Sequence, residues 1–171
     1  DARCPFERDP DDITKGRVAG GSSSGSAVSI SDGMAPATIG SDTGGSTRAP
    51  AAFCGIVGLK PTTTRMPSDG IFPLSQSFDA AGPMANSVSC CAILDSLMAG
   101  GSGKDEPAFA VKGLRLALPK GYLFEDLDPH VASSFAAAVD RLSAAGADIS
   151  DITLAEIEAL RPSNNTKSIV A

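Results

Sequence analysis

Two short glycine- and serine-rich elements near the start of the chain constrain its fold more than any other feature. The first is GGSSSGS at residues 20–26, and the second is DTGGSTR at residues 42–48. By composition alone, stretches of this kind are typical of flexible linkers. The residues between them are small and mostly apolar, as in Ala27–Ile30 and Met34–Ile39. Such residues suit packing inside a domain better than tethering, so we expect both elements to belong to one packed core.

A glycine-rich turn that carries hydroxyl groups can form a site for acyl transfer. Glycine lets backbone N–H groups approach a ligand closely and adopt positive φ, and a run of such N–H groups forms a concave nest for negative charge. A hydroxyl beside that nest is placed to attack a carbonyl while the N–H groups hold the developing oxyanion. The second element fits this pattern with Ser46 as the attacking residue, and Ser22 in the first element can relay the proton.

The stretch closely resembles the central segment of the amidase signature family. The resemblance is carried by GGSSSGSA at 20–27, GSDTGGSTRAPAAFCGIVGLKPT at 40–62 and SFDAAGP at 77–83, which match almost continuously. It implies a Ser–cis-Ser–Lys triad with Ser46 as the nucleophile and Ser22 as the bridging serine, held by a cis peptide bond after Gly21. It also implies an oxyanion hole formed by the backbone amides of Thr43, Gly44, Gly45 and Ser46. The supporting residues that it implies are Gly21, Ser23, Asp42 and Arg48.

Charged residues around the nucleophile are expected to hold the site together. Asp42 and Arg48 flank Ser46, and we expect them to pair across the turn and keep its N–H groups in register. The alternative is an ordinary surface ion pair, which contributes little stability. Loss of Arg48 should therefore damage folding of the site rather than the chemical step. Asp79, in SFDAAGP, is expected to be a structural hydrogen-bonding residue, because a general acid of the two-carboxylate kind would need a partner carboxylate.

The chain departs from the family pattern at the catalytic lysine. In the family this lysine lies several dozen residues before the bridging serine, whereas 21 residues precede Ser22 here. Lys15 is the one lysine among them, and its polar, loop-like setting predicts a solvated surface charge. We therefore expect residues 1–171 to be the central part of a single amidase signature domain with both ends missing and with its signature core at 20–83.

Charge and composition argue against several other classes of protein. The net charge of −6 comes without a basic stripe, which argues against direct nucleic-acid binding. No run of about 18 apolar residues predicts a membrane span. The four cysteines form no C-x-x-C pair, and His130 is the one histidine, so a metal site is poorly supported and free thiols in a reducing cytoplasm are expected. His130 falls in the first turn of an expected helix, where we predict an exposed side chain rather than a catalytic base.

Hydrophobic periodicity and turn residues predict an α/β chain. Helices are expected at residues 24–32, 47–53, 87–98 and 128–146, the last with Asp128 as N-cap and Pro129 at N1, and residues 154–160 are expected to be partly helical. Strands are expected at 35–39, 55–59, 114–118 and 147–152, and loop at 1–19 and 62–83. The buried side chains of the helix at 128–146 should be Val131, Phe135, Ala138, Val139 and Leu142. The resemblance implies a mixed β-sheet core covered by helices on both faces.

The loop at residues 62–83 contains several large apolar residues, namely Ile71, Phe72, Leu74 and Phe78. They either line the acyl-binding side of the site or pack underneath it, and of the two we expect packing in the core.

Three functions follow from these features. The first is a stand-alone amidase that hydrolyses a small amide without metal or organic cofactor; GRVAGG and Ile-Phe-Pro-Leu-Ser look more like bacterial enzymes of this kind. The second is the glutamine-hydrolysing A subunit of a tRNA-dependent amidotransferase, and the third is a folded but catalytically incomplete fragment that lacks the triad lysine. The expected partners are a small amide substrate and either a second copy of the chain, in a homodimer, or the other subunits of an amidotransferase. The expected location is the cytoplasm. A glutamine-dependent assay with and without partner subunits separates the first two, and poor labelling of Ser46 by a fluorophosphonate supports the third.

Overall fold

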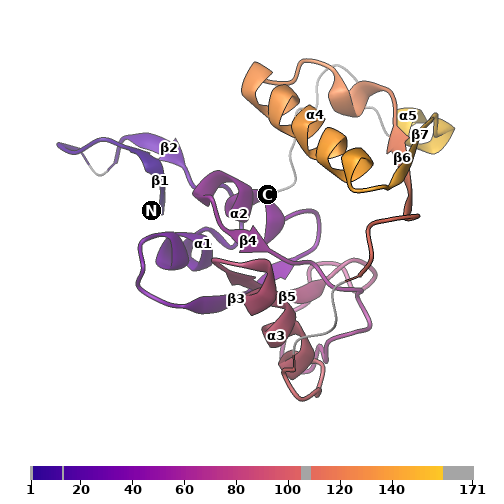
Figure 1. Ribbon diagram of the computed structural model, residues 1–171. Helices are drawn as coiled ribbons and strands as arrows, with labels where there is room; N and C mark the ends of the chain where they lie inside the picture. The colour runs from indigo at the N-terminus through magenta and orange to yellow at the C-terminus, as the bar shows by residue number, and fades with distance from the viewer. Residues whose placement is uncertain (1, 13, 105–108, 160–171) are drawn as a thin grey trace. The chain divides into compact units, whose positions relative to one another are not determined.

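The computed structural model describes residues 2–12, 14–104 and 109–159, which belong to two compact units. The first unit lies within residues 1–106 and the second within residues 107–167 (Figure 1). The first unit contains, in chain order, β1 (Arg3–Arg8), β2 (Gly16–Val18), α1 (Ser24–Ser31), β3 (Ala37–Asp42), α2 (Arg48–Cys54), β4 (Val57–Gly58), β5 (Ala80–Ala85) and α3 (Val88–Met98).

The main sheet of the first unit has the strand order β3-β5-β4, and both pairings are antiparallel. β3 and β5 run alongside each other over their whole length, from Ala37 opposite Ala85 to Asp42 opposite Ala80. Met84 of β5 packs with α1 and α2, whereas the neighbouring Pro83 and Ala85, which are also buried, point to the opposite face. α3 contacts β5 and β4, and Figure 1 shows it on the other side of the sheet from α1 and α2. Both faces of β5 are therefore covered by helices.

The core of this unit is built from small residues. Ala27 and Ile30 of α1 pack with Ala51 and Cys54 of α2 and with Met84. A Cβ added to Gly40 in β3 would lie 2.6 Å from Ser23 Oγ and 2.8 Å from Thr47 Cγ2. Glycine at this position lets the strand approach both glycine- and serine-rich elements closely, so the two elements meet at the end of β3.

The expected helices of this unit are confirmed. α1, α2 and α3 match the helices expected at 24–32, 47–53 and 87–98, and the Ser87 side chain caps α3 by accepting from Cys90 N–H at 3.1 Å. The strand expected at 35–39 is β3, displaced by two to three residues, and the strand expected at 55–59 is the shorter β4. Along α3, Cys91 is buried while Val88 is exposed.

Two segments expected to be loop contain strands. Residues 1–19 are expected to be loop from their sequence, but β1 and β2 pair there as an antiparallel hairpin. The same expectation at residues 62–83 is wrong for the last four, which begin β5, whose sequence is AAGPMA. Glycine and proline are depleted in strands, so this segment carries no local strand signal. It forms a strand because small residues fit between the helices on its two faces.

The second unit contains β6 (Arg115–Pro119), the 3₁₀ helix η1 (Tyr122–Phe124), α4 (Pro129–Ala144), β7 (Asp148–Ile152) and α5 (Ala155–Ala159). β6 and β7 pair in parallel, so the chain returns through a crossover that contains α4. Asp128 caps α4 by accepting from His130 N–H at 2.8 Å, and Pro129 is at N1, as expected. His130 is exposed, which was also expected.

The face of α4 that was expected to be buried is exposed. Val131, Phe135 and Leu142 are exposed, and α4 has no buried residue in the part of the chain that the structure describes. Phe135 packs against Phe124, with ring centroids 5.1 Å apart. The periodicity identified an amphipathic helix correctly, but one two-stranded sheet offers too little surface to cover it.

The α/β class is confirmed, with antiparallel and parallel pairing divided among three separate sheets in the described residues. Within those residues no helix is long and apolar enough to cross a membrane, and no group of three or more metal-ligating side chains occurs. The four cysteines are free, and Cys90 is the exposed one.

Candidate functional site

The second glycine- and serine-rich element forms the turn between β3 and α2. β3 ends at Asp42, and α2 begins at Arg48. Gly45 adopts φ +129°, which side chains with a Cβ rarely allow, so this position requires glycine. Ser46, the predicted nucleophile, follows directly and is 8% exposed. The turn therefore holds Ser46 between the end of a strand and the start of a helix.

Asp42 is the centre of the polar contacts inside this turn, and its side chain is fully buried. Its Oδ1 accepts from the Gly45 N–H at 2.7 Å, and its Oδ2 accepts from the Thr47 hydroxyl at 2.8 Å and from the Thr47 N–H at 3.2 Å. The Arg48 guanidinium donates from Nε to Oδ2 at 3.0 Å and from Nη2 to Oδ1 at 3.1 Å. The expected pair of Asp42 and Arg48 is present as a two-point contact inside the turn.

The electrostatics of Asp42 follow from these contacts. Burial alone would raise the pKa of this carboxyl, but the hydrogen bonds from Arg48, Thr47 and Gly45 hold it well below its usual range. Asp42 in turn raises the pKa of the Arg48 guanidinium. The carboxylate therefore stays charged and serves as part of the frame of the turn.

One amide of the expected oxyanion hole is engaged elsewhere. The Gly45 N–H donates to Asp42, which turns it toward the carboxylate. Within the described residues, the N–H groups of Thr43, Gly44 and Ser46 have no protein acceptor. Of the four amides expected from the sequence, three are thus free to donate to a ligand.

The first glycine- and serine-rich element is tied to Ser46 and to the end of β3. Ser23 donates its N–H to the Ser46 carbonyl at 3.1 Å and its hydroxyl to the Ser41 carbonyl at 3.3 Å. The peptide bond between Gly21 and Ser22 is cis, as the family resemblance implies. Ser23 therefore fixes the element that carries Ser22 against the turn that carries Ser46.

Ser22 and Ser46 line the same cavity, which has a volume of about 760 Å³. Thr43 and Gly44 lie on its wall beside them. Within the described residues, the Ser22 and Ser46 hydroxyls are not hydrogen-bonded to each other. The structure thus brings the two predicted catalytic serines and the free amides to one cavity, and it shows no lysine or histidine among the described lining residues.

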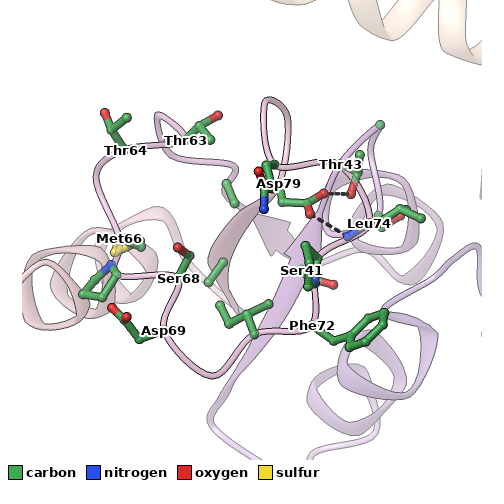
Figure 2. A pocket seen from close by; sticks show the side chains of 18 of the residues that line it. Ser41, Thr43, Thr63, Thr64, Met66, Ser68, Asp69, Phe72, Leu74 and Asp79 are labelled. Atoms are coloured by element: carbon green, nitrogen blue, oxygen red, sulfur yellow. Dashed lines mark hydrogen bonds between the residues drawn. The ribbon is translucent and has the colours of Figure 1, made fainter.

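The opposite wall of the cavity comes from the long segment between β4 and β5, which includes the labelled Thr63, Met66, Ser68 and Asp69 (Figure 2). Phe72 and Leu74 also line the cavity and are strongly exposed, at 95% and 75%. The expectation that the apolar residues of this segment pack in the core is therefore wrong, and Ile71 and Phe78 are exposed as well. The segment borders the cavity instead of passing under the sheet.

Asp79 connects this segment to the nucleophile turn. Its Oδ1 accepts from the Thr43 hydroxyl, and its Oδ2 accepts from the N–H groups of Leu74 and Ser75 at 2.8 Å each (Figure 2). The hydrogen bond from Thr43, followed by those from Ser75 and Leu74, lowers the pKa of Asp79. The expectation that Asp79 is a structural hydrogen-bonding residue is confirmed.

Lys60 is a residue of this region that the sequence analysis missed. It follows β4, and its Nζ donates to the Asp42 carbonyl at 2.6 Å and to the Phe78 carbonyl. The same Nζ lies 4.0 Å from Asp42 Oδ1. The available signal was a lysine inside the apolar run of GLKP, which is unusual for a solvated charge. Lys15 pairs with Asp12 at 3.2 Å and is strongly exposed, as expected for a surface charge.

Comparison with known proteins gives a consistent family. The family model described as Amidase matches residues 9–170. In Roseiflexus sp. (strain RS-1), the A subunit of the glutamyl-tRNA(Gln) amidotransferase is 42% identical over 151 residues, which cover 81% of this chain and 31% of that protein. Its counterpart in Marinomonas sp. (strain MWYL1) is 43% identical over 159 residues, which cover 85% of this chain and 33% of that protein.

Solved structures agree with this result. The A subunit of the Thermotoga maritima glutamyl-tRNA(Gln) amidotransferase is similar with a TM-score of 0.75 and 33% identity, over 88% of this chain and 36% of that one. The peptide amidase of Stenotrophomonas maltophilia is similar with a TM-score of 0.71 and 34% identity, over 89% of this chain and 35% of that one. The chain spans about a third of the length of the curated relatives it matches.

Proposed function

The chain belongs to the amidase family, and on that premise we propose that it carries the nucleophile part of a site that hydrolyses a carboxamide C–N bond. Ser46 is the proposed nucleophile, and Ser22 is the proposed bridging serine. The observation that carries the proposal is that both serines line one cavity beside backbone N–H groups with no acceptor among the described residues. A hydroxyl and converging amide donors are what acyl transfer to serine requires.

The proposed reaction proceeds through an acyl-enzyme. Ser46 Oγ attacks the amide carbon and gives up its proton through Ser22 to a base, and the carbonyl electrons move to the oxygen. The N–H groups of Thr43, Gly44 and Ser46 stabilise that oxyanion. When the tetrahedral intermediate collapses, the C–N bond breaks and the leaving ammonia or amine takes the proton back through Ser22. Water then attacks the ester and releases the carboxylic acid and Ser46.

The proposed base is the lysine of the family triad, and no lysine that the structure describes in the first unit lines the cavity. Lys15 pairs with Asp12 at the surface, and Lys60 donates to two carbonyl oxygens. We therefore propose that these 171 residues are inactive by themselves and that turnover needs the lysine-bearing segment of the family. For the isolated chain we therefore propose the third function expected from the sequence, a catalytically incomplete fragment.

A second candidate function is glutamine hydrolysis as the A subunit of a tRNA-dependent amidotransferase. The similarity to amidotransferase A subunits, at 41–43% identity in several bacteria, favours it. The partners would then be the other amidotransferase subunits, and for a stand-alone amidase a homodimer is the proposed assembly. Ammonia release from glutamine, compared with release from small amides, separates the two functions when it is measured with and without partner subunits.

The proposed substrate is a small amide, for which a cavity of about 760 Å³ has sufficient room. We also propose that this chain is bacterial and that it is located in the cytoplasm. The support is that the amidotransferase A subunits of Roseiflexus and Marinomonas described above are bacterial and that buried free thiols such as Cys54 are typical of reducing compartments.

The experiment that tests the proposed function is the change Ser46→Ala in the full-length natural protein. We expect kcat for an amide to fall at least about 10⁴-fold, because the nucleophile is lost. Ser31→Ala is the matched control, since the Ser31 hydroxyl donates to the Val28 carbonyl inside α1, away from the cavity. Amidase turnover that survives Ser46→Ala would remove the assignment.

A further inference from the structure

We propose that Lys60 positions the backbone N–H of Thr43 toward the oxyanion. Lys60 would then be a positioning residue for the reaction, acting through the peptide group between Asp42 and Thr43. This inference rests on the proposed function, because it concerns the same cavity.

The contacts of Lys60 are specific and well sheltered from water. Nζ donates to the Asp42 carbonyl at 2.6 Å and to the Phe78 carbonyl, and the side chain is 20% exposed. An ammonium group that has lost most of its water needs compensating partners. Two carbonyl oxygens and the Asp42 carboxylate at 4.0 Å provide them. Lys60 is therefore held as a donor, and the position of the Asp42 carbonyl is fixed by a charged group.

Fixing this carbonyl also fixes the N–H of the next residue. The Asp42 C=O and the Thr43 N–H belong to one planar peptide group, and in a trans peptide these two bonds point in opposite directions. The carbonyl points to Lys60, so the N–H points away from Lys60. Thr43 lines the cavity and Lys60 does not, so we infer that the N–H faces the cavity side. A charged donor on the carbonyl also polarises the peptide group and makes its N–H a stronger donor.

The side chain of Thr43 is held from the other direction. Its hydroxyl donates to Asp79, and Asp79 is fixed by the N–H groups of Leu74 and Ser75. Lys60 reaches the carbonyl of Phe78, which precedes Asp79. The backbone and the side chain of Thr43 are thus anchored separately, and the anchor from Lys60 acts on the peptide group that carries the N–H.

The first test compares Lys60→Met, Lys60→Arg and the control Lys15→Met in the full-length natural enzyme. Lys60→Met should lower kcat about 10- to 100-fold with KM unchanged within about twofold. The reason is that a misaligned Thr43 N–H binds the oxyanion of the transition state less well, whereas the binding of the ground-state amide does not depend on this N–H. Affinity for a substrate-like aldehyde, which forms an oxyanion on Ser46, should fall by the same factor, whereas affinity for the product carboxylic acid should not change. Lys60→Arg should recover part of kcat, and Lys15→Met should behave like the natural enzyme.

The second test does not depend on turnover. Asp42–Thr43 is the only Asp–Thr dipeptide in this sequence. Enzyme labelled with ¹³C at aspartate carbonyls and ¹⁵N at threonine amides therefore gives one NMR signal for this peptide group from these residues, which is assigned by its loss in Thr43→Val. The signal should shift in Lys60→Met and keep its position in Lys15→Met.

The outcomes separate this inference from the proposed function. If Lys60→Met leaves kcat and the NMR signal unchanged while Ser46→Ala abolishes turnover, the role of Lys60 is refuted and the proposed function stands. A fall in kcat without a parallel loss of aldehyde affinity also refutes it. If Ser46→Ala keeps its activity, the proposed function fails, and the NMR signal alone then decides whether Lys60 orients the Thr43 peptide. Should Lys60→Met fail to fold, the same comparisons are made with Lys60→Gln, which removes the charge, and for which unchanged aldehyde affinity and an unchanged signal refute the role.

Discussion

Asp42 shows how a single buried carboxylate organises the nucleophile turn. It accepts hydrogen bonds from three neighbouring residues of the turn, so its contribution to stability depends on its charge. Its pKa in the folded protein is held below the ordinary value of 3.8. The stabilisation is therefore complete above the pKa of an unfolded aspartate and is lost as the pH falls toward the folded-state pKa.

We predict that Asp42→Asn lowers the free energy of unfolding at neutral pH by about 3 kcal/mol, because the Arg48 guanidinium and the turn amides lose their charged acceptor. The variant should also lose the part of the acid sensitivity below about pH 4 that Asp42 provides. Denaturant unfolding between pH 3 and pH 7 measures both effects. Asp69→Asn, at an exposed site, is the control and should stay within about 0.5 kcal/mol of the natural protein. A parallel pH dependence of Asp42→Asn and the natural protein would contradict the role of Asp42.

Arg48 is predicted to support the fold of the site and not the chemical step. Half of its side chain is exposed, so Arg48→Met should cost about 1–2 kcal/mol of unfolding free energy, less than loss of the buried Asp42. Turnover per active site, counted by titration with a fluorophosphonate, should stay close to that of the natural enzyme. Arg17→Met, which breaks the exposed pair with Glu7, is the matched control with an expected change below about 0.5 kcal/mol. A large loss of turnover per titrated site would assign Arg48 to the chemistry instead.

The elements differ in how well the sequence predicts them. The helices carry local signals, such as the caps Ser87 and Asp128, and these signals are sufficient to predict them. β5 carries none, because AAGPMA becomes a strand only through the helices that cover it. The site divides in the same way: the predictions of Ser22, Ser46 and the Asp42–Arg48 pair follow from a continuous motif, whereas the contacts of Lys60 are with carbonyls 18 residues away in either direction.

The close approach of β5 to the segment after β4 gives a prediction at this scale. A Cβ on Gly82 would lie 2.0 Å from the Leu59 carbonyl oxygen, so Gly82→Ala must displace backbone. We expect a loss of about 2–4 kcal/mol in unfolding free energy. Gly25→Ala in α1 is the control, because its Cβ meets nothing within 4 Å and alanine favours a helix. Equal stability of the two variants, measured by thermal unfolding, would contradict the packing of β5.

The cap of α4 gives a second prediction for an element. Asp128→Ala removes the acceptor of the His130 N–H and should destabilise the second unit by about 1 kcal/mol. Asp128→Asn keeps a side-chain acceptor and should lose little. Denaturant unfolding followed by circular dichroism compares the two. An Asn variant as unstable as the Ala variant would show that the charge, and not the cap, matters.

At the scale of the whole molecule, the chain corresponds to about a third of its relatives, and it forms two compact units in the structure. That residues 1–171 are the central part of one domain, with a signature core at 20–83, stays a prediction. The exposed apolar residues Val131 and Phe135 of α4 are consistent with it, since a longer chain would have more surface to cover them.

The proposal that the base lies outside these residues gives a prediction that depends on the whole protein. The isolated 171-residue chain should react with a fluorophosphonate at Ser46 at least about 100-fold more slowly than the full-length natural protein, because the proposed base that activates the serine would be absent. Labelling rates measured by intact mass, with Ser46→Ala as the unreactive control, test this. Equal rates for the two proteins would mean that a base for Ser46 lies within these residues.

The most direct test of the central claim is to locate the covalent adduct after the full-length protein has reacted with a fluorophosphonate. Trypsin releases residues 18–48 as one peptide, which contains both Ser22 and Ser46, so fragment masses must assign the modified residue. We predict a single adduct on Ser46, with amidase activity lost in proportion to labelling. An adduct on Ser22 or on another residue, or full activity after complete labelling of Ser46, would contradict the assignment of Ser46 as the nucleophile.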